Sequence, residues 1–193
     1  MKRGATKEEI IRTTQDLITR NGIRAVRVDE IAQRLGISKR TLYEMFADKN
    51  DLISACLDDL ARRQRQRIAA SRRRRSGNPL QRTLRLANDY IDSLYTVDHS
   101  FLADIRRKVL FAEQYDERRE FWRKELSLNL EECRGGGLLL SEIDTAALAE
   151  QLMSTLFELR LNRTTREELY LLCRTILRGA ATQQGIDLID RKP

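Results

Sequence analysis

Apolar residues recur at helical spacing along most of this chain, and that spacing limits the folds open to it. Ile10, Ile11, Leu17 and Ile18 form the first stripe, and comparable stripes continue to about residue 180. Recurrence at three and four residues is typical of amphipathic helices. Strand-like alternation reaches no convincing length, and the chain holds only two prolines. The sequence therefore predicts an all-α fold without internal repeats.

Capping signals indicate that four helices begin within the first sixty residues. Residues 6–9 (TKEE) have the pattern of a capping box, and Gly22 suits the left-handed position after a helix end. Gly36 stops the second helix, Ser38 can cap the third, and Asp48 can cap the fourth. Four helices are therefore expected before residue 60.

Further helices are predicted in the rest of the chain. Residues 76–79 (SGNP) have the pattern of a stop, a cap and a first-turn proline. Helical patterns continue through Phe101–Glu113 and Glu117–Cys133, followed by three glycines that indicate a hinge. Two final helices are expected near residues 144–162 and 165–180.

Positive charge is concentrated in the N-terminal part of the chain. The net charge is +7 overall. Residues 1–76 hold 19 Lys or Arg and 10 Asp or Glu, a net +9, whereas the remainder holds 17 and 19, a net −2. A local excess of basic residues favours a polyanionic partner for that part.

The cysteine and histidine content argues against metal and redox chemistry. Cys56, Cys133 and Cys173 are far apart, form no CxxC pair and sit in apolar helical patterns, so reduced core thiols are the favoured interpretation over a redox sensor. His99 is the single histidine, which rules out a multi-histidine metal site. We therefore predict neither a metal nor a cofactor.

Catalytic and membrane patterns are also missing from the sequence. It has no phosphate loop, no GxGxxG, no HExxH and no serine–histidine or cysteine–histidine arrangement. No run approaches the roughly 18 apolar residues that cross a bilayer. The N-terminus, MKRGATKEEI, lacks the apolar core of a signal peptide. We expect a cytoplasmic protein that is not an enzyme.

Two of the short helices have the form of a helix-turn-helix, because a tight turn containing glycine joins them. Ile31, Leu35, Leu42 and Phe46 are spaced to lock this pair at a steep angle. Such packing leaves the N-terminal half of the 39–45 helix free to enter a major groove of DNA. An ordinary helical hairpin with solvated charges is the alternative.

The exposed side chains of that helix suit DNA. Lys39 and Arg40 can donate to guanine or phosphate, and Thr41 can touch a thymine methyl group or a phosphate. The Tyr43 hydroxyl can donate to the backbone of the duplex, and Lys49 is expected beside the same groove edge. Sequence and chemistry together favour a DNA contact.

The stretch GISKRTLYEMFADKNDLI resembles the helix-turn-helix signature of the TetR family of transcriptional regulators. The likeness covers roughly residues 5–57. Residues 142–161 (EIDTAALAEQLMSTLFELRL) and 167–180 (EELYLLCRTILRGA) also resemble the last two helices of that family, which pair across its dimer.

The resemblance implies a dimeric regulator, expected to repress by binding a (pseudo)palindromic operator and to leave it when a small-molecule effector binds. It implies a three-helix DNA-binding domain over residues 5–52, joined by a long helix to a helical effector-binding and dimerisation domain over residues 53–190. Activation instead of repression would leave the helix-turn-helix unchanged. The DNA contacts implied are Arg27, Ser38, Lys39, Arg40, Thr41, Tyr43 and Lys49.

Three positions depart from the family pattern. Arg27 stands where a capping Ser or Thr is frequent, and it cannot cap a helix. Arg40 stands where small residues are frequent, and Glu44 is acidic where neutral side chains are frequent. These departures indicate an altered operator preference.

Aromatic residues are frequent in the C-terminal part, where helical spacing is usually a sign of core packing. In a regulator of this type some of them should line an effector site, and apolar walls suit an apolar or aromatic small molecule. Asn88, Asp92 and His99 are possible polar contacts. The effector-binding residues predicted are Tyr90, Leu94, Phe101, Phe111, Trp122 and Phe157.

The final two helices are predicted to form the dimer. Each carries an apolar stripe, and two such helices from each chain give a four-helix bundle. The interface residues predicted are Leu148, Leu152, Leu156, Leu159, Leu169, Cys173, Ile176 and Ala180.

A helical adaptor is the second interpretation. The segment Arg62–Arg75 (RRQRQRIAASRRRR) could bind an acidic protein, add phosphate contacts, or be a solvated helix end. An adaptor would not depend on the 39–45 helix, so substitutions there separate the two functions.

Overall fold

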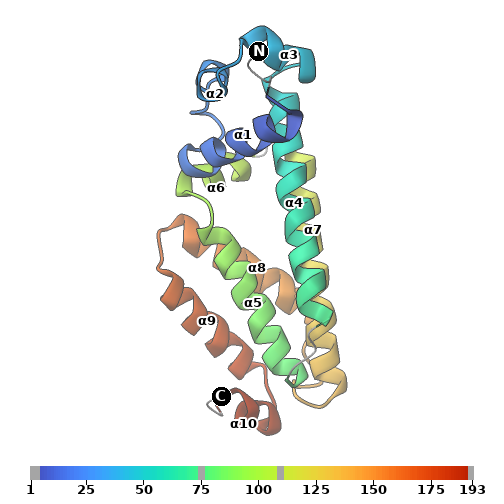
Figure 1. Ribbon diagram of the computed structural model, residues 1–193. Coiled ribbons are helices and arrows are strands. Elements are labelled where there is room, and N and C mark those ends of the chain that lie inside the picture. Colours follow the sequence, from blue (N-terminus) through green and yellow to red (C-terminus); the bar gives the residue numbers. More distant parts are fainter. Residues whose placement is uncertain (1–4, 74–76, 108–110, 191–193) are drawn as a thin grey trace. The chain divides into compact units, whose positions relative to one another are not determined.

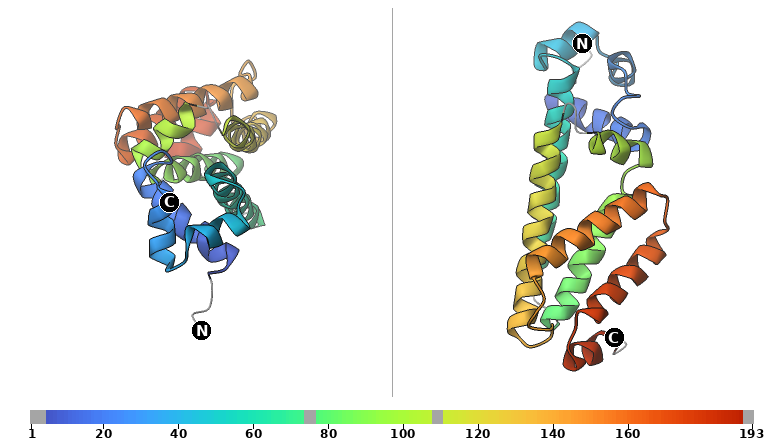
Figure 2. Two further views of the ribbon diagram at one scale, coloured as in Figure 1. Left: turned by 90° about the horizontal axis from the view of Figure 1, so that it is seen from above. Right: turned by 180° about the vertical axis from the view of Figure 1, so that it is seen from behind.

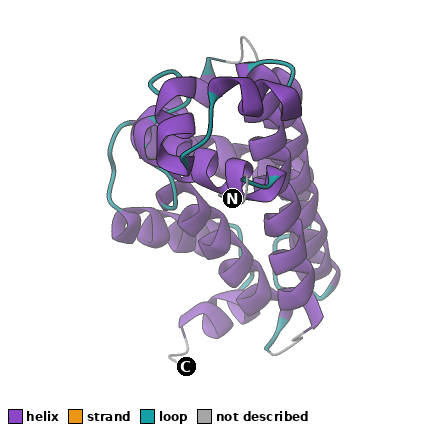
Figure 3. Cartoon of the chain, turned by 45° about the horizontal axis from the view of Figure 1, so that its top comes forward, coloured by secondary structure: helices purple, strands orange, loops and turns teal. Residues whose placement is uncertain are grey.

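The computed structural model describes residues 5–73, 77–107 and 111–190, with residues 72 and 73 described by their backbone alone. Within these ranges the regular elements are all α-helices, as predicted, apart from an isolated bridge between Leu139 and Ala181 (Figure 1, Figure 3). In chain order the helices are α1 (Lys7–Asn21), α2 (Val28–Leu35), α3 (Lys39–Met45), α4 (Lys49–Arg73), α5 (Pro79–Tyr95), α6 (His99–Arg106), α7 (Ala112–Gly135), α8 (Thr145–Leu161), α9 (Arg166–Gly179) and α10 (Gln183–Asp190).

The chain forms two compact units. Unit 1 comprises residues 1–72 and 97–116, and unit 2 comprises residues 73–96 and 117–193. Helix α4 continues to pack on α1 beyond residue 52, where the boundary between the two functional domains is predicted. Gln15 Nε2 donates to the Cys56 carbonyl oxygen and to the Asp59 carboxylate, at 2.9 Å each.

Unit 1 is organised around α1. Thr6 and Glu9 form the predicted capping box, in which Glu9 N donates to Thr6 Oγ1 at 3.2 Å and Thr6 N donates to Glu9 Oε2 at 2.7 Å. The apolar face of α1 then lies in a core shared by α2, α3 and α4. Its fully buried members are Ile10, Leu17, Ile18, Ile31, Leu42, Phe46, Leu52, Ile53 and Cys56.

Unit 2 is built from α5, α8, α9, α10 and most of α7. Helix α5 packs against α8 and α9, and α10 packs against α5 and α9 (Figure 2). Asn78 caps α5, since its Oδ1 accepts from Gln81 N at 2.9 Å and Pro79 begins the helix. Thr165 and Glu168 cap α9 with a second capping box.

The structure differs from the predicted helices in two places. The helix expected over Phe101–Glu113 is two helices, since α6 ends at Arg106 and α7 begins at Ala112. A further helix, α10, follows the two that were expected to be the last. It lies against residue 138, where a Cβ on Gly185 would stand 2.2 Å from the Leu138 carbonyl oxygen. Only glycine allows that approach.

No helix within the described ranges is long and apolar enough to cross a membrane.

Candidate functional site

Helices α2 and α3 form the predicted helix-turn-helix. Gly36 has φ 65°, a left-handed conformation that ends α2, and Ile37 N donates back to the Ala32 carbonyl oxygen at 3.1 Å. Ser38 then caps α3, because its Oγ accepts from Thr41 N at 3.1 Å. The hydrogen bonds that form this turn therefore all come from residues 32–41.

Buried apolar side chains fix α3 to unit 1. Ile31 and Leu42 are fully buried, and Phe46, just after the end of α3, is buried beside them. Lys7 from the start of α1 lies over the Phe46 ring, with 4.9 Å from Nζ to the ring centroid. The opposite side of α3 is left on the surface.

That surface of α3 carries basic, hydroxyl and aromatic groups. Lys39 and Arg40 are exposed, and Tyr43 is 46% exposed, which is unusual for a large aromatic residue. Thr41 is half-buried, and its hydroxyl shares a 2.9 Å hydrogen bond with Ser38 Oγ. Hydrogen-bond donors therefore dominate the face on which α3 could meet a ligand.

Acidic residues pair with two of these cations. Lys39 Nζ lies 2.6 Å from Asp29 Oδ1 on α2, and Arg40 Nε lies 3.2 Å from Glu44 Oε1 one turn along α3. Both pairs are exposed, so each contributes under about 1 kcal/mol and can be exchanged for another anion. They hold the two basic side chains close to the surface of α3.

Arg27 and Lys49 stand at helix starts on either side of α3. Arg27 occupies the N-cap position of α2 and makes no side-chain cap bond there, as its chemistry predicts. Lys49 is the first residue of α4 and is half-buried. Burial lowers the pKa of Lys49, and the charge of Asp104 partly opposes that change. The predicted cap of α4 is present, with Asp51 N donating to Asp48 Oδ1 at 2.8 Å.

Helix α6 also belongs to unit 1, which the sequence did not indicate. Asp98 N donates to the Thr19 carbonyl oxygen at 2.6 Å, and Arg24 N donates to Asp104 Oδ2 at 3.0 Å. Gly22 lies between these contacts at φ 84°, and a Cβ there would stand 3.0 Å from Ser100 and Asp104 side-chain atoms. The turn between α1 and α2 is therefore docked on α6.

The predicted effector residues fall in two groups. Tyr90 and Leu94 on α5, Trp122 on α7 and Phe157 on α8 belong to unit 2, whereas Phe101 and Phe111 belong to unit 1. In unit 2 the Tyr90 and Trp122 rings meet edge to face, with centroids 5.3 Å apart.

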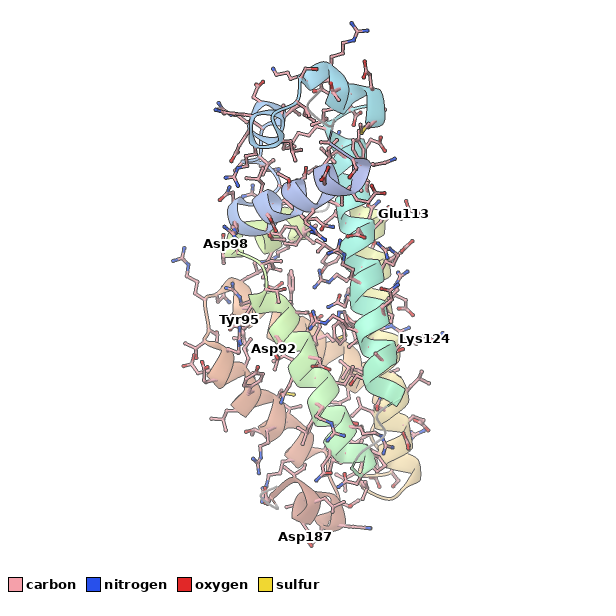
Figure 4. The ribbon with its side chains drawn as sticks, in the orientation of Figure 1. Asp92, Tyr95, Asp98, Glu113, Lys124 and Asp187 are labelled. Atoms are coloured by element: carbon pink, nitrogen blue, oxygen red, sulfur yellow. The ribbon has the colours of Figure 1, made fainter. Side chains whose placement is uncertain are left out.

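Among the predicted polar candidates, Asp92 is held by another side chain of unit 2. Asp92 accepts a hydrogen bond from the Tyr170 hydroxyl on α9, and Figure 4 shows Asp92 with Tyr95 on α5. Asn88 is half-buried on the same helix, and His99 belongs to unit 1. Sequence reasoning passed over Arg118 on α7, whose Nη2 lies 3.4 Å from Ser93 Oγ. A lone arginine in a charged helix gives no signal that it points inward.

Most of the predicted dimer residues are core residues of the chain itself. Leu148, Leu159 and Ile176 are half-buried, and Leu171, which was not predicted, is 66% exposed. The inner stripes of α8 and α9 therefore pack within the chain, on α5 and on each other, and the predicted interface stays a prediction. The buried members are Leu152, Leu156, Leu169, Cys173 and Ala180.

The cysteines are buried and free, in agreement with the sequence interpretation. Burial raises the pKa of Cys56 and of Cys173 to about 12, so neither thiol ionises readily. Within the described ranges, no cluster of three or more His, Cys, Asp or Glu side chains could hold a metal ion.

Known proteins resemble the chain in two ways. Residues 10–56 match the family model for bacterial regulatory proteins of the tetR family. An uncharacterized HTH-type transcriptional regulator of Mycobacterium tuberculosis, known from two strains, is 43% identical over 51 residues, which are 26% of this chain and 21% of the relative. The match thus spans about a fifth of the length of those curated relatives.

Solved structures share the fold over nearly the whole chain. A regulator from Saccharomonospora viridis in complex with choline has a TM-score of 0.78 at 18% identity, covering 91% of this chain and 96% of its own. A gamma-butyrolactone receptor has a TM-score of 0.69 at 22% identity, covering 93% and 92%. At these identities the likeness is one of fold.

Proposed function

We propose that this chain, which belongs to the tetR family of bacterial regulatory proteins, binds duplex DNA as a cytoplasmic transcriptional repressor and leaves it when an effector binds. The observation that carries the proposal is the outward face of α3. Its inner residue Leu42 is buried, while Lys39, Arg40 and Tyr43 stand exposed on the other side. A fold needs no such set of donors on one short helix.

The dimensions and chemistry of α3 suit a major groove. The groove is about 12 Å wide and admits one helix. Lys39 and Arg40 lie in the first turn of α3, the end that meets base edges in helix-turn-helix proteins. Ser38 lies just before that turn and Thr41 lies within it, where their hydroxyls could bind phosphate. Arg27 and Lys49 stand at the starts of α2 and α4.

A dimer would place two such helices on one duplex. Successive major grooves on one side of DNA lie roughly 34–36 Å apart, so a twofold dimer would read a (pseudo)palindromic operator. The surface that supports a dimer is the outer side of α8 and α9, where Leu171 is 66% exposed. Leu148, Leu159 and Ile176 are half-buried and could lose their remaining exposure there.

Effector release needs an element that couples the two units. Helix α6 is a candidate within unit 1, because the Asp98–Thr19 and Asp104–Arg24 hydrogen bonds tie it to the turn that leads into α2. The long helix α4 directly follows α3 in the chain and is the second candidate. An effector acts through either helix only by its difference in affinity for the two states.

The test is DNA binding by the purified chain. Genomic fragments selected at low salt should include its own promoter region, and binding should weaken steeply with salt, by about one log–log slope unit per phosphate contact. Failure to shift any such fragment would overturn the proposal.

One double substitution separates the regulator from the adaptor. Tyr43→Ala with Thr41→Ala should abolish operator binding and preserve the helical signal, because Tyr43 lies outside the core. Arg20→Ala is a suitable control, since Arg20 is exposed and lies near the end of α1, outside the helix-turn-helix. An adaptor that uses Arg62–Arg75, whose residues 74 and 75 lie outside the described ranges, would be unaffected by the double substitution.

A further inference from the structure

Four side chains of unit 2 meet between α5 and α7 and form what we term the donor cluster: Tyr90, Ser93, Arg118 and Trp122. Tyr90 and Ser93 are three residues apart on α5, and Arg118 and Trp122 are four apart on α7, so each pair shares a helix face. The Tyr90 ring meets Trp122 at 5.3 Å, and Ser93 Oγ meets Arg118 at 3.4 Å.

Trp122 brings a buried donor without an acceptor. Its side chain is 1% exposed, and its Nε1–H has no hydrogen-bond partner among the residues that the structure describes. The ring itself is held by aromatic contacts, with Tyr90 and with Phe121 at 5.9 Å between centroids. An indole N–H can only donate, and buried donors in native proteins nearly always find an acceptor.

Arg118 brings a positive charge without a carboxylate. In the described part of the chain its side chain makes no ion pair, and its hydrogen bond to Ser93 Oγ is long, at 3.4 Å. Ser93 is neutral and donates its own hydroxyl proton to the Tyr90 carbonyl oxygen at 2.7 Å, so it does not balance the charge of Arg118. Burial lowers the pKa of Arg118, yet a guanidinium stays protonated at neutral pH. Arg118 is half-buried, and charges that are withdrawn from water are normally paired.

The contrast with neighbouring arginines on α7 is clear. Arg119 pairs with Glu150, Arg123 pairs with Glu120 at 2.6 Å, and Arg134 pairs with Glu131 at 2.7 Å. Each of these has a carboxylate from this chain within reach. Arg118 is therefore distinguished from them by the missing anion.

We propose that Arg118 and the Trp122 indole N–H bind the carboxylate of a small apolar monocarboxylic acid, and that this acid is the effector. Only the effector role rests on the proposed function, whereas carboxylate binding by these two side chains does not depend on it. One carboxylate oxygen accepts from the guanidinium and the other from the indole, while the aromatic rings contact the apolar part. A hydrogen bond from a guanidinium to a carboxylate is charge-assisted and about twice as strong as a neutral one, which favours this geometry.

The charge of the cluster narrows the ligand class. A single guanidinium balances a singly charged group, whereas a phosphate monoester would bring nearly two negative charges. A neutral ligand or a water molecule would satisfy the indole but leave the guanidinium uncompensated. A cation such as choline, which one of the structurally similar proteins binds, would meet like charge here.

The ligand test uses the fluorescence of Trp122, the single tryptophan of the chain. Octanoate and phenylacetate, titrated into the unaltered protein, should change this fluorescence and raise the melting temperature. Octanamide and phenylacetamide have the same shapes without the charge, and should bind at least about tenfold more weakly. The proposal is overturned if neither acid binds at millimolar concentration, or if the amides bind as tightly as the acids.

Substitutions locate the site. Arg118→Gln should lower the affinity for the acids by about tenfold or more and leave the affinity for the amides unchanged. Arg118→Lys should restore part of the affinity for the acids. Trp122→Phe keeps an aromatic ring and removes the N–H. Because it also removes the fluorescent side chain, acid binding to this variant is measured by calorimetry. Arg123→Gln removes a cation that is already paired with Glu120, and should bind like the unaltered protein. Unchanged carboxylate affinity in Arg118→Gln would refute the assignment.

Binding of the acid and binding of DNA are separate measurements. Failure of the chain to bind DNA would refute the proposed function and would not alter the fluorescence titration. Carboxylate binding that depends on Arg118 but leaves DNA affinity unchanged would refute the effector role. The two failures can thus be told apart.

Discussion

Lys39 on α3 and Asp29 on α2 form an ion pair with 2.6 Å between Nζ and Oδ1. Both side chains are more than half exposed, at 55% and 68%, so the pair contributes little to the free energy of unfolding. Its position gives it a different significance. In the proposed DNA complex, Asp29 would compete with a phosphate or a base for the same ammonium group, and its own charge would be repelled by phosphate.

Removing that competitor should strengthen the proposed DNA complex. We expect Asp29→Asn to raise operator affinity by up to about fivefold at low salt, since an exposed pair is worth under about 1 kcal/mol. The salt dependence should steepen as Lys39 gains a phosphate contact. Fluorescence anisotropy at several salt concentrations measures both effects.

Asp16→Asn is the matched control, because it makes the same change in net charge on the exposed side of α1. Equal gains in the two variants would indicate a general charge effect. A loss of affinity in Asp29→Asn would mean that Asp29 helps to position Lys39.

The helix-turn-helix was accessible to sequence reasoning because its determinants are local. Gly36 ends α2, Ser38 caps α3, and Asp48 caps α4, all within a few residues of the groups they bond. Burial of Leu42 and Phe46 followed from helical spacing. Such features need no knowledge of the rest of the chain.

Other parts depend on contacts between distant residues. The docking of α6 uses Asp98 and Asp104, which meet residues about eighty positions earlier. The stripe with Leu152 and Leu156 looks the same whether its partner is another chain or, as found, the chain itself. Arg118 is one of many arginines in the sequence, and only the fold places it beside Ser93 on α5. Periodicity gives the inward face of a helix, not the identity of its partner.

The burial of the α8 and α9 stripes leads to a prediction about the dimer. Leu156 is fully buried, so Leu156→Glu should destabilise the fold by several kcal/mol by placing an unpaired carboxylate in the core. Leu171 is 66% exposed, so Leu171→Glu should leave the free energy of unfolding of the protomer nearly unchanged and yield monomers. Sedimentation and circular dichroism distinguish these outcomes.

Thr175→Glu provides a comparison on the same outer side of α9, where Thr175 is exposed and not apolar. If Leu171→Glu remains a dimer, the proposed interface is wrong. If Leu156→Glu folds as a stable monomer, its burial within the chain does not describe the protein in solution.

Tyr170 and Asp92 join α9 to α5 and should make stability sensitive to alkaline pH. The Tyr170 hydroxyl donates to Asp92, and burial, followed by this hydrogen bond and the charge of Asp92, raises the pKa of Tyr170 to about 12. A tyrosine in the unfolded chain ionises near pH 10. The stabilisation is therefore complete below pH 10 and is lost as pH rises from there through about 12.

Tyr170→Phe should cost about 1–3 kcal/mol at pH 8, since Asp92 loses a charged hydrogen bond. It should also flatten the loss of stability above pH 10. Urea unfolding between pH 8 and 11.5 measures both quantities, with Tyr43→Phe as a surface control. Parallel alkaline curves for Tyr170→Phe and the unaltered protein would contradict the linkage.

The contacts of α6 with the turn before α2 give a prediction about effector coupling. Asp104 accepts from Arg24 N at 3.0 Å and lies 3.7 Å from Arg24 Nε. Asp104→Ala should loosen this connection, leave the effector and the operator each bound with near-normal affinity, and reduce the factor by which one weakens the other. Linkage requires that factor to be the same in both directions. Effector affinity is therefore measured with and without saturating operator, and operator affinity with and without saturating effector.

An effector that released DNA yet bound equally well in the presence of operator would contradict the coupled equilibrium. If the Asp104→Ala protein keeps the full coupling between effector and operator binding, α6 does not transmit that coupling and α4 is the remaining candidate.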